Sequence, residues 1–460
     1  MTRYELYKKA SYDWLKNIPF HWEELFLEQI AQEKLKKNSN NDISKVLSLS
    51  YGSIKVKKDL NKGLISKDLS TYQIVEPGDI IMRLTDLQND HKSLRTGLVN
   101  DKGIITAAYL CLSPKINSRY LHYLLHSYDT LKVFYGMGGG VRQSIGFKDI
   151  RHMYLPVPPR TEQEQIVRFL DWKVSEINKL IGIKLKRILN IRDYEKQVIN
   201  EKVLNGLHSS DLKYSGNKWI GCIPDNWKII PLGKFCSFQN GISESGDFFT
   251  SGTPFVGYGD VYRHIELPIK VNGKAQANKK QQELFSVQKD DIFFTRTSEN
   301  LEEIGIAAVC SHTIDKAVFS GFLIRCRQKE KYVIANYMKY YLQIPAVRNH
   351  FSSNVNIVIR ASLSQNLLKT LPIVIPPENE QREIASYLDL KHTEFEKVIE
   401  ITTKEIEELN ELKNTLISDV VTGKIDVRNI EIPAYEHVED VVGDGEENAE
   451  ELADAEETEA

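Results

Sequence analysis

The chain contains an internal duplication, which limits its architecture more than any short motif does. The segment WLKNIPFHW begins at Trp14, and WIGCIPDNW begins at Trp219. Both copies keep the pattern W-x3-I-P-x2-W, which we call the tryptophan motif. A proline after isoleucine favours an extended or turn conformation, so each copy predicts a loop anchored by two indole rings.

A second repeated segment follows each tryptophan motif. LPVPPRTEQEQIVRFLDWKVSEINKL begins at Leu155, and PIVIPPENEQREIASYLDLKHTEFEKVI begins at Pro372. Weaker similarity lies between the two segments, as in VEPGDIIMR against VQKDDIFFTR. The chain is therefore a tandem duplication of one globular unit followed by one helix. The identical residues lie 218 positions apart and are Pro158, Pro159, Glu162, Gln163, Ile166, Leu170, Asp171, Lys173, Glu176 and Lys179 in the first copy, and Pro376, Pro377, Glu380, Gln381, Ile384, Leu388, Asp389, Lys391, Glu394 and Lys397 in the second.

Each proline pair starts a long amphipathic helix of about 40 residues, because apolar side chains recur near the 3.5-residue spacing of a coiled coil. Asn205-Gly206 and Thr422-Gly423 provide the C-terminal stops. The apolar positions are Ile166, Leu170, Ile177, Leu180, Ile188, Ile191 and Val198 in the first helix, and Ile384, Leu388, Phe395, Val398, Ile406, Leu409, Leu416 and Val420 in the second.

The globular units are predicted to mix α and β structure. Short strands such as residues 79–84 and 107–112 are bounded by Gly, Pro and Asp. Each unit closes with an amphipathic helix, at residues 120–134 and 332–341. No regular βαβ alternation is visible, which favours the α+β class over a doubly wound parallel sheet.

Composition excludes several classes of protein. No apolar run approaches the ~20 residues needed to cross a bilayer, and residues 1–14 lack the apolar region of a signal peptide. The five cysteines are widely spaced without a CxxC pair, which predicts a reducing cytoplasm, no disulfide framework and no structural zinc. Residues 430–460 carry 13 acidic side chains and no Lys or Arg, so residues 1–429 have a net charge of +10. A body of this charge can neutralise several phosphates.

This pattern resembles the specificity subunits of type I restriction-modification systems. The resemblance rests on the two tryptophan motifs, the PP-x2-EQ helix starts and the closing VVTGKIDVR at residues 420–428. Residues 75–99 and 136–151 also look like a recurring subtype of recognition domain. The resemblance covers residues 1 to about 430. It implies two target recognition domains separated by an antiparallel coiled coil of the two long helices. The expected boundaries are recognition domain 1 at 1–155, spacer helix 1 at 156–208, recognition domain 2 at 209–372, spacer helix 2 at 373–428 and a disordered acidic tail at 429–460.

The resemblance also implies a function. The chain is expected to recognise an asymmetric bipartite site in double-stranded DNA and to dock two methyltransferase subunits and the restriction subunits. It needs no cofactor of its own, because S-adenosylmethionine, ATP and Mg²⁺ belong to the partner subunits. We expect docking contacts at the Glu-Gln pair of each helix start, at Glu162, Gln163, Glu380 and Gln381.

The predicted DNA contacts come from basic and polar side chains near loops. The glycines around residues 136–140 precede Arg142, Gln143 and Ser144, and Arg suits guanine whereas Gln suits adenine. Phosphate contact or a turn role is the alternative for each residue, and a solvated surface charge is the alternative for the remaining cations. The predicted DNA-binding residues are Arg83, Lys92, Arg95, Arg142, Gln143, Ser144, Tyr258, Arg263, Arg296, Arg360 and Ser362.

No catalytic or metal-binding residues are predicted. Neither proline pair belongs to the D/N-P-P-Y/F loop of an amino-methyltransferase, and the Pro224-Asp225 pair is replaced by Pro19-Phe20 in the other copy. The chain lacks the GKS or GKT that would make its glycine-rich loop an ATP site. Two other functions remain open at this point: an enzyme with an unrecognised site, or a coiled-coil scaffold or DNA-binding adaptor outside a restriction system.

Overall fold

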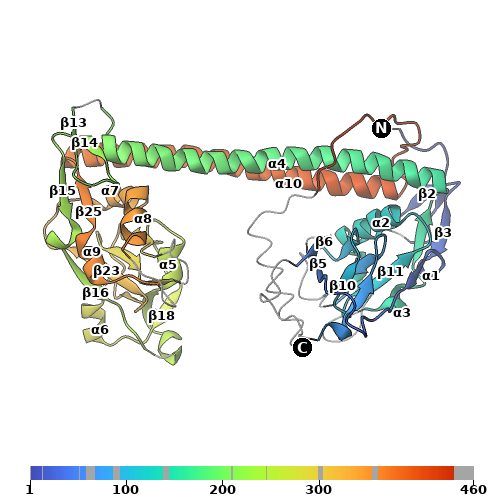
Figure 1. Ribbon diagram of the computed structural model, residues 1–460, viewed down its shortest axis with the longest axis horizontal. Coiled ribbons are helices and arrows are strands. Elements are labelled where there is room, and N and C mark those ends of the chain that lie inside the picture. Colours follow the sequence, from blue (N-terminus) through green and yellow to red (C-terminus); the bar gives the residue numbers. More distant parts are fainter. Residues whose placement is uncertain are drawn as a thin grey trace. The chain divides into compact units, whose positions relative to one another are not determined.

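The computed structural model describes residues 2–12, 14–50, 52–57, 68–85, 87, 94–137, 145–208, 211–244, 246–298, 304–354 and 361–439 (Figure 1). The chain divides into two compact units. Unit 1 consists of Met1–Arg187 with Thr402–Ala460, and unit 2 consists of Ile188–Ile401. Among the described residues, we find no helix that combines the length and the apolar character needed to cross a bilayer.

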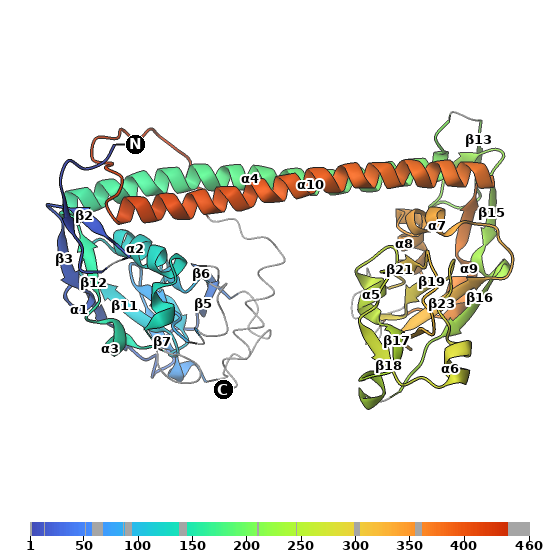
Figure 2. The same ribbon diagram turned by 180° about the vertical axis from the view of Figure 1, so that it is seen from behind.

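Unit 1 is built on a six-stranded sheet with the order β4-β11-β8-β9-β6-β5. Its pairs are antiparallel except for β6 with β9. Helix α2 packs against this sheet (Figure 2). The strands are β1 Tyr7–Lys9, β2 Asn17–Pro19, β3 Glu23–Phe26, β4 Ala31–Glu33, β5 Leu47–Ser50, β6 Ser53–Val56, β7 Gln73–Val75, β8 Ile80–Met82, β9 Thr96–Leu98, β10 Gly103–Ile105, β11 Leu110–Pro114 and β12 Tyr154–Val157, and the helices are α1 Leu27–Ile30, η1 Leu69–Thr71, α2 Ser118–Thr130, η2 Val133–Gly136 and α3 Phe147–Ile150.

Unit 2 is built on a four-stranded antiparallel sheet with the order β16-β23-β19-β21, and a separate three-stranded sheet has the order β18-β17-β22. The strands are β13 Leu212–Tyr214, β14 Cys222–Pro224, β15 Lys228–Pro231, β16 Cys236–Asn240, β17 Thr253–Val256, β18 Gly273–Ala275, β19 Ile292–Thr295, β20 Thr297–Ser298, β21 Ala307–Val309, β22 Val318–Phe319, β23 Leu323–Gln328, β24 Ala361–Ser362 and β25 Pro372–Ile375, and the helices are η3 Leu232–Lys234, η4 Gly246–Phe249, α5 Tyr258–Tyr262, α6 Lys279–Leu284, α7 Ala335–Tyr341, α8 Pro345–Ser352 and α9 Gln365–Thr370.

The main sheets of the two units contain four strands in the same order. The order β4-β11-β8-β9 in unit 1 matches β16-β23-β19-β21 in unit 2, and the matched sequences VEPGDIIMR and VQKDDIFFTR contain β8 and β19. Unit 1 extends this core with β6 and β5, whereas unit 2 carries the separate β18-β17-β22 sheet. The duplication is therefore visible in the strand order, and the units differ in what surrounds it.

Each unit has the same stem where it joins the long helices. In unit 1, β3 pairs antiparallel with β12, and in unit 2, β15 pairs antiparallel with β25. A short hairpin precedes each stem, β1 with β2 and β13 with β14, and its second strand ends at the proline of the tryptophan motif. The chain thus enters and leaves each sheet region through paired strands.

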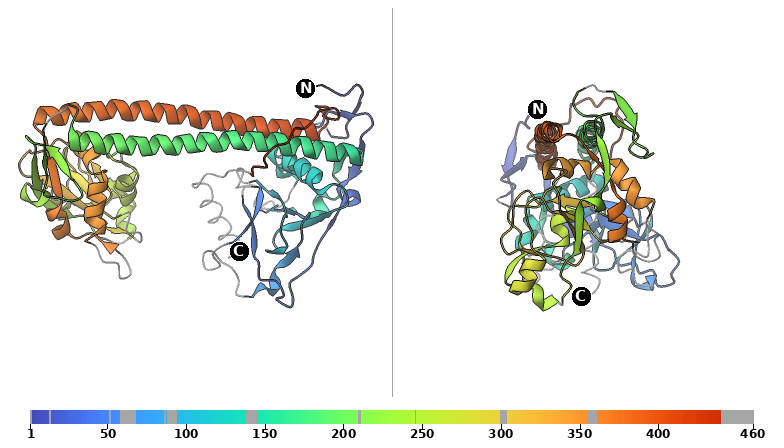
Figure 3. Two further views of the ribbon diagram at one scale, coloured as in Figure 1. Left: turned by 45° about the horizontal axis from the view of Figure 1, so that its top comes forward. Right: turned by 90° about the vertical axis from the view of Figure 1, so that its left-hand side faces the viewer.

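The two long helices are α4 Arg160–Asn205, with 46 residues, and α10 Glu378–Val421, with 44 residues. Each begins directly after its proline pair, as the sequence predicts. Within each unit the helices lie side by side and antiparallel (Figure 3). In unit 1, Lys184 Nζ donates to Glu405 Oε2 at 2.7 Å, and in unit 2 the rings of Tyr194 and Phe395 are 5.8 Å apart.

The predicted apolar seam of α4 is right at most positions and wrong at Leu180. Ile166, Leu170 and Ile177 are buried, but Leu180 is 48% exposed and Ile181 is buried in its place. The buried position moves by four residues rather than three here, because a straight helix has 3.6 residues per turn and drifts away from a strict 3.5-residue repeat.

Each helix ends against the unit that precedes the other helix. Tyr120 Oη in unit 1 donates to Val421 O at the end of α10, and Tyr337 Oη in unit 2 donates to Val203 O near the end of α4, both at 3.3 Å. Gly423 and Gly206 follow the helix ends, and both have a φ of 76°. The end of α10 thus completes the core of unit 1, and the end of α4 completes the core of unit 2.

Residues 429–439, which we call the C-terminal strap, lie along the first half of α4. Asn178 Nδ2 donates to Val438 O at 3.0 Å, and Gln165 Nε2 donates to Ile430 O at 2.8 Å. Ser175 and Asn178 are both 2% exposed. The predicted disordered tail therefore does not begin at residue 429, because side chains of α4 bind the backbone of the strap. The remaining part of that prediction, residues 440–460, lies outside the described residues.

Deleting residues 429–460 is expected to lower the free energy of unfolding of unit 1 by about 1–3 kcal/mol, because several hydrogen bonds are lost and two buried polar side chains are exposed. Deleting only residues 440–460 should change it by less than about 0.5 kcal/mol. Urea titration followed by hydrogen exchange of unit 1 peptides measures both. Equal losses in the two deletions would show that the strap contributes nothing.

Candidate nucleic-acid interface

The predicted docking residue Glu162 lies inside unit 1, where it is 6% exposed. Its Oε1 accepts from Tyr4 Oη at 2.7 Å and from Trp22 Nε1 at 3.0 Å. Its Oε2 lies 2.8 Å from His21 Nε2. Burial and the hydrogen bond to Glu162 raise the pKa of Tyr4, so its phenol remains a donor. Glu162 therefore holds the tryptophan motif against the start of α4.

The repeat places Glu380 in the same role in unit 2. Glu380 Oε2 accepts from Trp227 Nε1 at 2.8 Å, and Oε1 accepts from Asn226 Nδ2 at 3.2 Å. Trp22 and Trp227 are both fully buried. The second tryptophan of each motif thus donates a hydrogen bond to a glutamate that is the third residue of a long helix.

The two glutamines of the Glu-Gln pairs bind backbone groups. Gln163 Oε1 accepts from Asn117 N at the start of α2, and its Nε2 donates to Pro158 O. Gln381 repeats this pattern with Ile334 N and Pro376 O. Glu162, Gln163 and Gln381 are buried, and docking of a partner subunit at the Glu-Gln pairs stays a prediction. In the structure the pairs connect the long helices to their own units.

Two predicted DNA-binding arginines of unit 1 are also buried. Arg95 is 0% exposed, and its Nη1 donates to Thr85 O at 2.6 Å while its backbone N donates to Asp129 Oδ2 at 2.6 Å. Arg83 is 4% exposed, and its backbone N donates to Arg95 O. Arg83 directly follows β8 and Arg95 directly precedes β9, so both lie inside unit 1, and their contact with DNA stays a prediction.

Several predicted contacts cannot be placed. Lys92, Arg142, Gln143, Ser144 and Arg360 lie outside the described residues.

In unit 2, two predicted residues lie on one short helix. Tyr258 is the first residue of α5, and Arg263 is its exposed C-cap. The rings of Tyr258 and Tyr262 stack with centroids 5.7 Å apart, and Tyr262 is 39% exposed. Because α5 packs against β19 and β21, these aromatic and cationic groups lie beside the central sheet.

The other two described residues of this set are Arg296, which lies between β19 and β20, and Ser362, which lies on β24. β20 pairs with β24, and Thr297, which follows Arg296, is the partner of Ser362. Next to this strand pair, Leu363 N donates a hydrogen bond to Arg296 O. Sequence reasoning missed Phe322, which is 62% exposed and accepts a backbone hydrogen bond from Arg296 N. The sequence feature that could have revealed Phe322 is an aromatic residue directly after Gly321, in the turn between β22 and β23.

Arginine, serine and exposed aromatic side chains thus gather where β19 ends, on backbone fixed by strand pairing. Such groups suit phosphate and base edges, because guanidinium groups bind both and aromatic rings pack on bases and sugars.

Two segments of the chain, residues 21–190 and 224–411, match the family model of the type I restriction modification DNA specificity domain. These segments cover more than half of the chain. The chain belongs to this family. It is the specificity subunit of a type I restriction-modification system, and its two matched segments correspond to the two copies of the duplication.

Relatives support the assignment. The specificity subunit of the type I restriction enzyme MjaVIII from Methanocaldococcus jannaschii is 22% identical over 388 residues, covering 81% of this chain and 85% of its own. A second chain of that organism, named as the MjaX specificity subunit, is 26% identical over 331 residues, covering 68% and 69%.

The fold of the specificity subunit is shared with a solved chain from a study of complex assembly and conformational transition in a type I restriction-modification system. The two chains are 16% identical and superpose with a TM-score of 0.63. The match covers 89% of this chain and 99% of the solved chain. The predicted family and the predicted two-copy fold are both confirmed.

Proposed function

We propose that this specificity subunit recognises an asymmetric, bipartite sequence in double-stranded DNA, with one half bound by the sheet region of each unit. The helices α4 and α10 form an antiparallel coiled coil that separates the two recognition domains. Two methyltransferase subunits and the restriction subunits dock on the chain and supply S-adenosylmethionine, ATP and Mg²⁺. The chain itself performs no catalysis.

The observation that carries this proposal is a shared frame around two different sheet regions. The Trp–Glu hydrogen bond, the stem strands and the four-strand core recur in both units, whereas the strands added to that core differ. The recurring features provide equivalent positions for two identical partners. The strands that differ between the units present different side chains to DNA, which favours two different half-sites.

Within this proposal, Tyr258, Arg263, Arg296 and Ser362 contact the half-site of unit 2. Lys92, Arg142, Gln143 and Ser144 contact the half-site of unit 1, and Arg360 joins the unit 2 set. The phosphate contacts among them make binding salt-dependent.

Enrichment of random duplex DNA by the chain with its methyltransferase partner tests this function, and mapping of methylated bases in cells gives an independent readout. The proposal predicts one motif with two specified parts and a fixed unspecified gap. A scaffold or adaptor without DNA specificity would enrich no motif, and methylation by the chain alone would reveal an enzyme.

Exchanging one sheet region should change one half of the motif only. The structure gives the junctions: residues 27–153 lie between β3 and β12, so a relative's segment can replace them without altering the stem or the Trp22–Glu162 hydrogen bond. The expected result is a new first half-site with the second half-site and the gap unchanged, measured by methylation mapping.

The matched exchange replaces residues 232–371 between β15 and β25, and it should change the other half-site. If either exchange altered both halves, the two units would not read DNA independently.

A further inference from the structure

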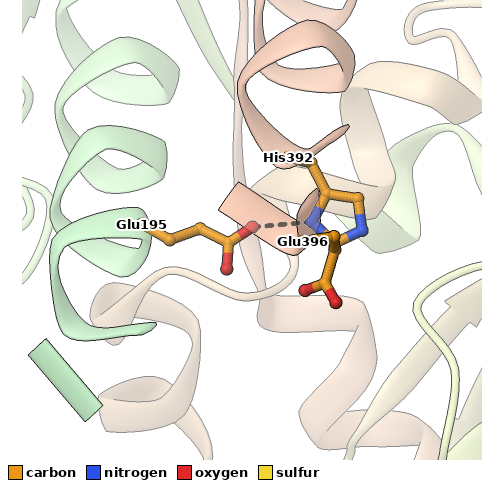
Figure 4. A group of neighbouring side chains, drawn as sticks. All are labelled: Glu195, His392 and Glu396. Carbon is orange, nitrogen blue, oxygen red and sulfur yellow. Dashed lines mark hydrogen bonds and ion pairs between the residues drawn. The ribbon is translucent and has the colours of Figure 1, made fainter. Parts of the chain in front are cut away.

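A group of three metal-ligating side chains lies between the long helices within unit 2. Glu195 projects from α4, and His392 and Glu396 project from α10 (Figure 4). His392 Nδ1 and Glu195 Oε1 are 2.6 Å apart, and one ligand atom from each of the three residues lies within 4.8 Å of the others. None of these residues belongs to the proposed DNA contacts or to the Trp–Glu frame.

The spacing on α10 suits chelation of one ion. His392 and Glu396 are four residues apart, so they lie on the same face of the helix one turn apart. Two ligands at this spacing on one helix, completed by a carboxylate from elsewhere, are a known arrangement for zinc. Ligand atoms around a tetrahedral Zn²⁺ lie about 3.3 Å apart, because each bond is about 2.0–2.2 Å. Ligand atoms that lie up to 4.8 Å apart therefore need to close by up to about 1.5 Å, and the Glu195–His392 pair at 2.6 Å needs to open by about 0.7 Å. Rotamer adjustment can provide both movements.

The duplication supplies an internal comparison. The positions 218 residues away from this group in the repeat are Lys413, Val174 and Asn178. There Lys413 Nζ donates to Asn178 Oδ1 at 3.3 Å, an ordinary polar contact between the helices. At these three matching positions the long helices pack without an acidic or imidazole side chain. Packing does not require the ligand set of unit 2.

Burial makes the charge of Glu195 depend on nearby cations. The Glu195 side chain is 11% exposed, and a carboxylate at this depth loses much of its hydration. Its charge is offset by His392 and by Arg192, whose Nη1 lies 3.5 Å from Glu195 Oε2. Arg192 also forms a two-pronged ion pair with Glu396. One divalent cation can replace the proton of the imidazole and the guanidinium together, with balanced charge.

We propose that Glu195, His392 and Glu396 bind a divalent transition-metal ion, with Zn²⁺ as the best match. The imidazole selects against Mg²⁺ and Ca²⁺, which prefer oxygen ligands alone. The ion joins α4 to α10 in unit 2 and leaves a fourth position for water. Arg192 competes with the ion for Glu396.

Zn²⁺ binding to the purified full-length chain, measured by competition with a chromophoric chelator, tests the site. Cys222 has an exposed free thiol, which is a zinc-ligand type, so all variants carry Cys222→Ser. The expected result is one Zn²⁺ per chain, a higher Tm in the presence of Zn²⁺ and no response to Mg²⁺.

Two ligand variants and one competitor variant separate a metal site from an ion-pair network. Glu195→Gln, which preserves shape, and His392→Ala should each weaken Zn²⁺ binding about tenfold or more. Arg192→Gln should tighten it roughly three- to fivefold, because a competing ion pair worth about 0.5–1 kcal/mol is removed. A purely structural network predicts no gain in affinity for that variant.

Glu405→Gln is the matched control, because it removes one carboxylate from another interhelical ion pair, Lys184–Glu405. It should leave Zn²⁺ affinity unchanged. Absence of bound Zn²⁺, or equal binding by wild type, Glu195→Gln and His392→Ala, would overturn the proposal.

Discussion

Replacing Glu162 with alanine is expected to destabilise unit 1 by about 2–5 kcal/mol. The substitution removes the acceptor of Tyr4 Oη and Trp22 Nε1, and both donors remain buried. An unsatisfied buried donor costs about 1–3 kcal/mol, and the lost side-chain volume adds to that cost. The effect should be confined to unit 1, so hydrogen exchange of unit 1 and unit 2 peptides in urea measures it directly.

The chain provides two controls for this prediction. Glu162→Gln retains an oxygen that can accept from both donors and should cost less than the alanine variant. Glu380→Ala removes the matching acceptor in unit 2 and should cost about 1–3 kcal/mol. The expected cost is smaller because Trp227 is fully buried, whereas the hydrogen bond from Asn226, the second donor, is exposed. If Glu162→Ala left unit 1 as stable as wild type, the carboxylate would not hold the tryptophan motif.

Replacing Gly423 with alanine is expected to cost unit 1 about 2–5 kcal/mol. The residue has a φ of 76°, which an L side chain adopts at a cost of about 1–2 kcal/mol. A Cβ at this position would also lie 2.3 Å from Pro19 Cδ, inside the tryptophan motif. Overpacking of this kind costs about 1–3 kcal/mol. Thermal unfolding and hydrogen exchange of unit 1 give the measured value.

Two glycines with the same φ of 76° calibrate the experiment. A Cβ on Gly206 would lie 3.2 Å from Trp227 Cζ2, and a Cβ on Gly221 would meet nothing within 4 Å. Gly221→Ala should therefore show the backbone cost alone, and Gly206→Ala an intermediate loss in unit 2. Equal losses at all three positions would mean that contact with the tryptophan motif contributes nothing.

The long helices and the duplication were predictable because their signals are periodic. The proline pairs mark the observed helix starts, and Gly206 and Gly423 follow the observed ends. The shift of burial from Leu180 to Ile181 was not predictable from a fixed repeat, since it depends on how the helix drifts against its neighbour.

The positions of charged side chains were predicted less well. The sequence predicted partner docking at Glu162 and DNA contact at Arg95, and it did not predict that both side chains are buried. Both are buried because their donors and acceptors come from distant parts of the sequence, as in the bond between Glu162 and Tyr4. The metal-ligand group escaped notice for the same reason, because 197 residues separate Glu195 from His392.

The strap shows a different limit of sequence reasoning. Acidic composition predicted disorder from residue 429, but composition does not reveal that Gln165 and Asn178 offer amide groups to the backbone of this segment.

The closure of each unit by the helix of the other repeat has a consequence for the origin of the chain. A half-length ancestor, with one sheet region and one helix, would have lacked the helix end that now packs in the same core as its tryptophan motif. Two such ancestors completing each other would form a symmetric homodimer, and a symmetric dimer reads a palindrome. Fusion of two such copies would let their sequences diverge, as the strands that surround the common four-strand order have done.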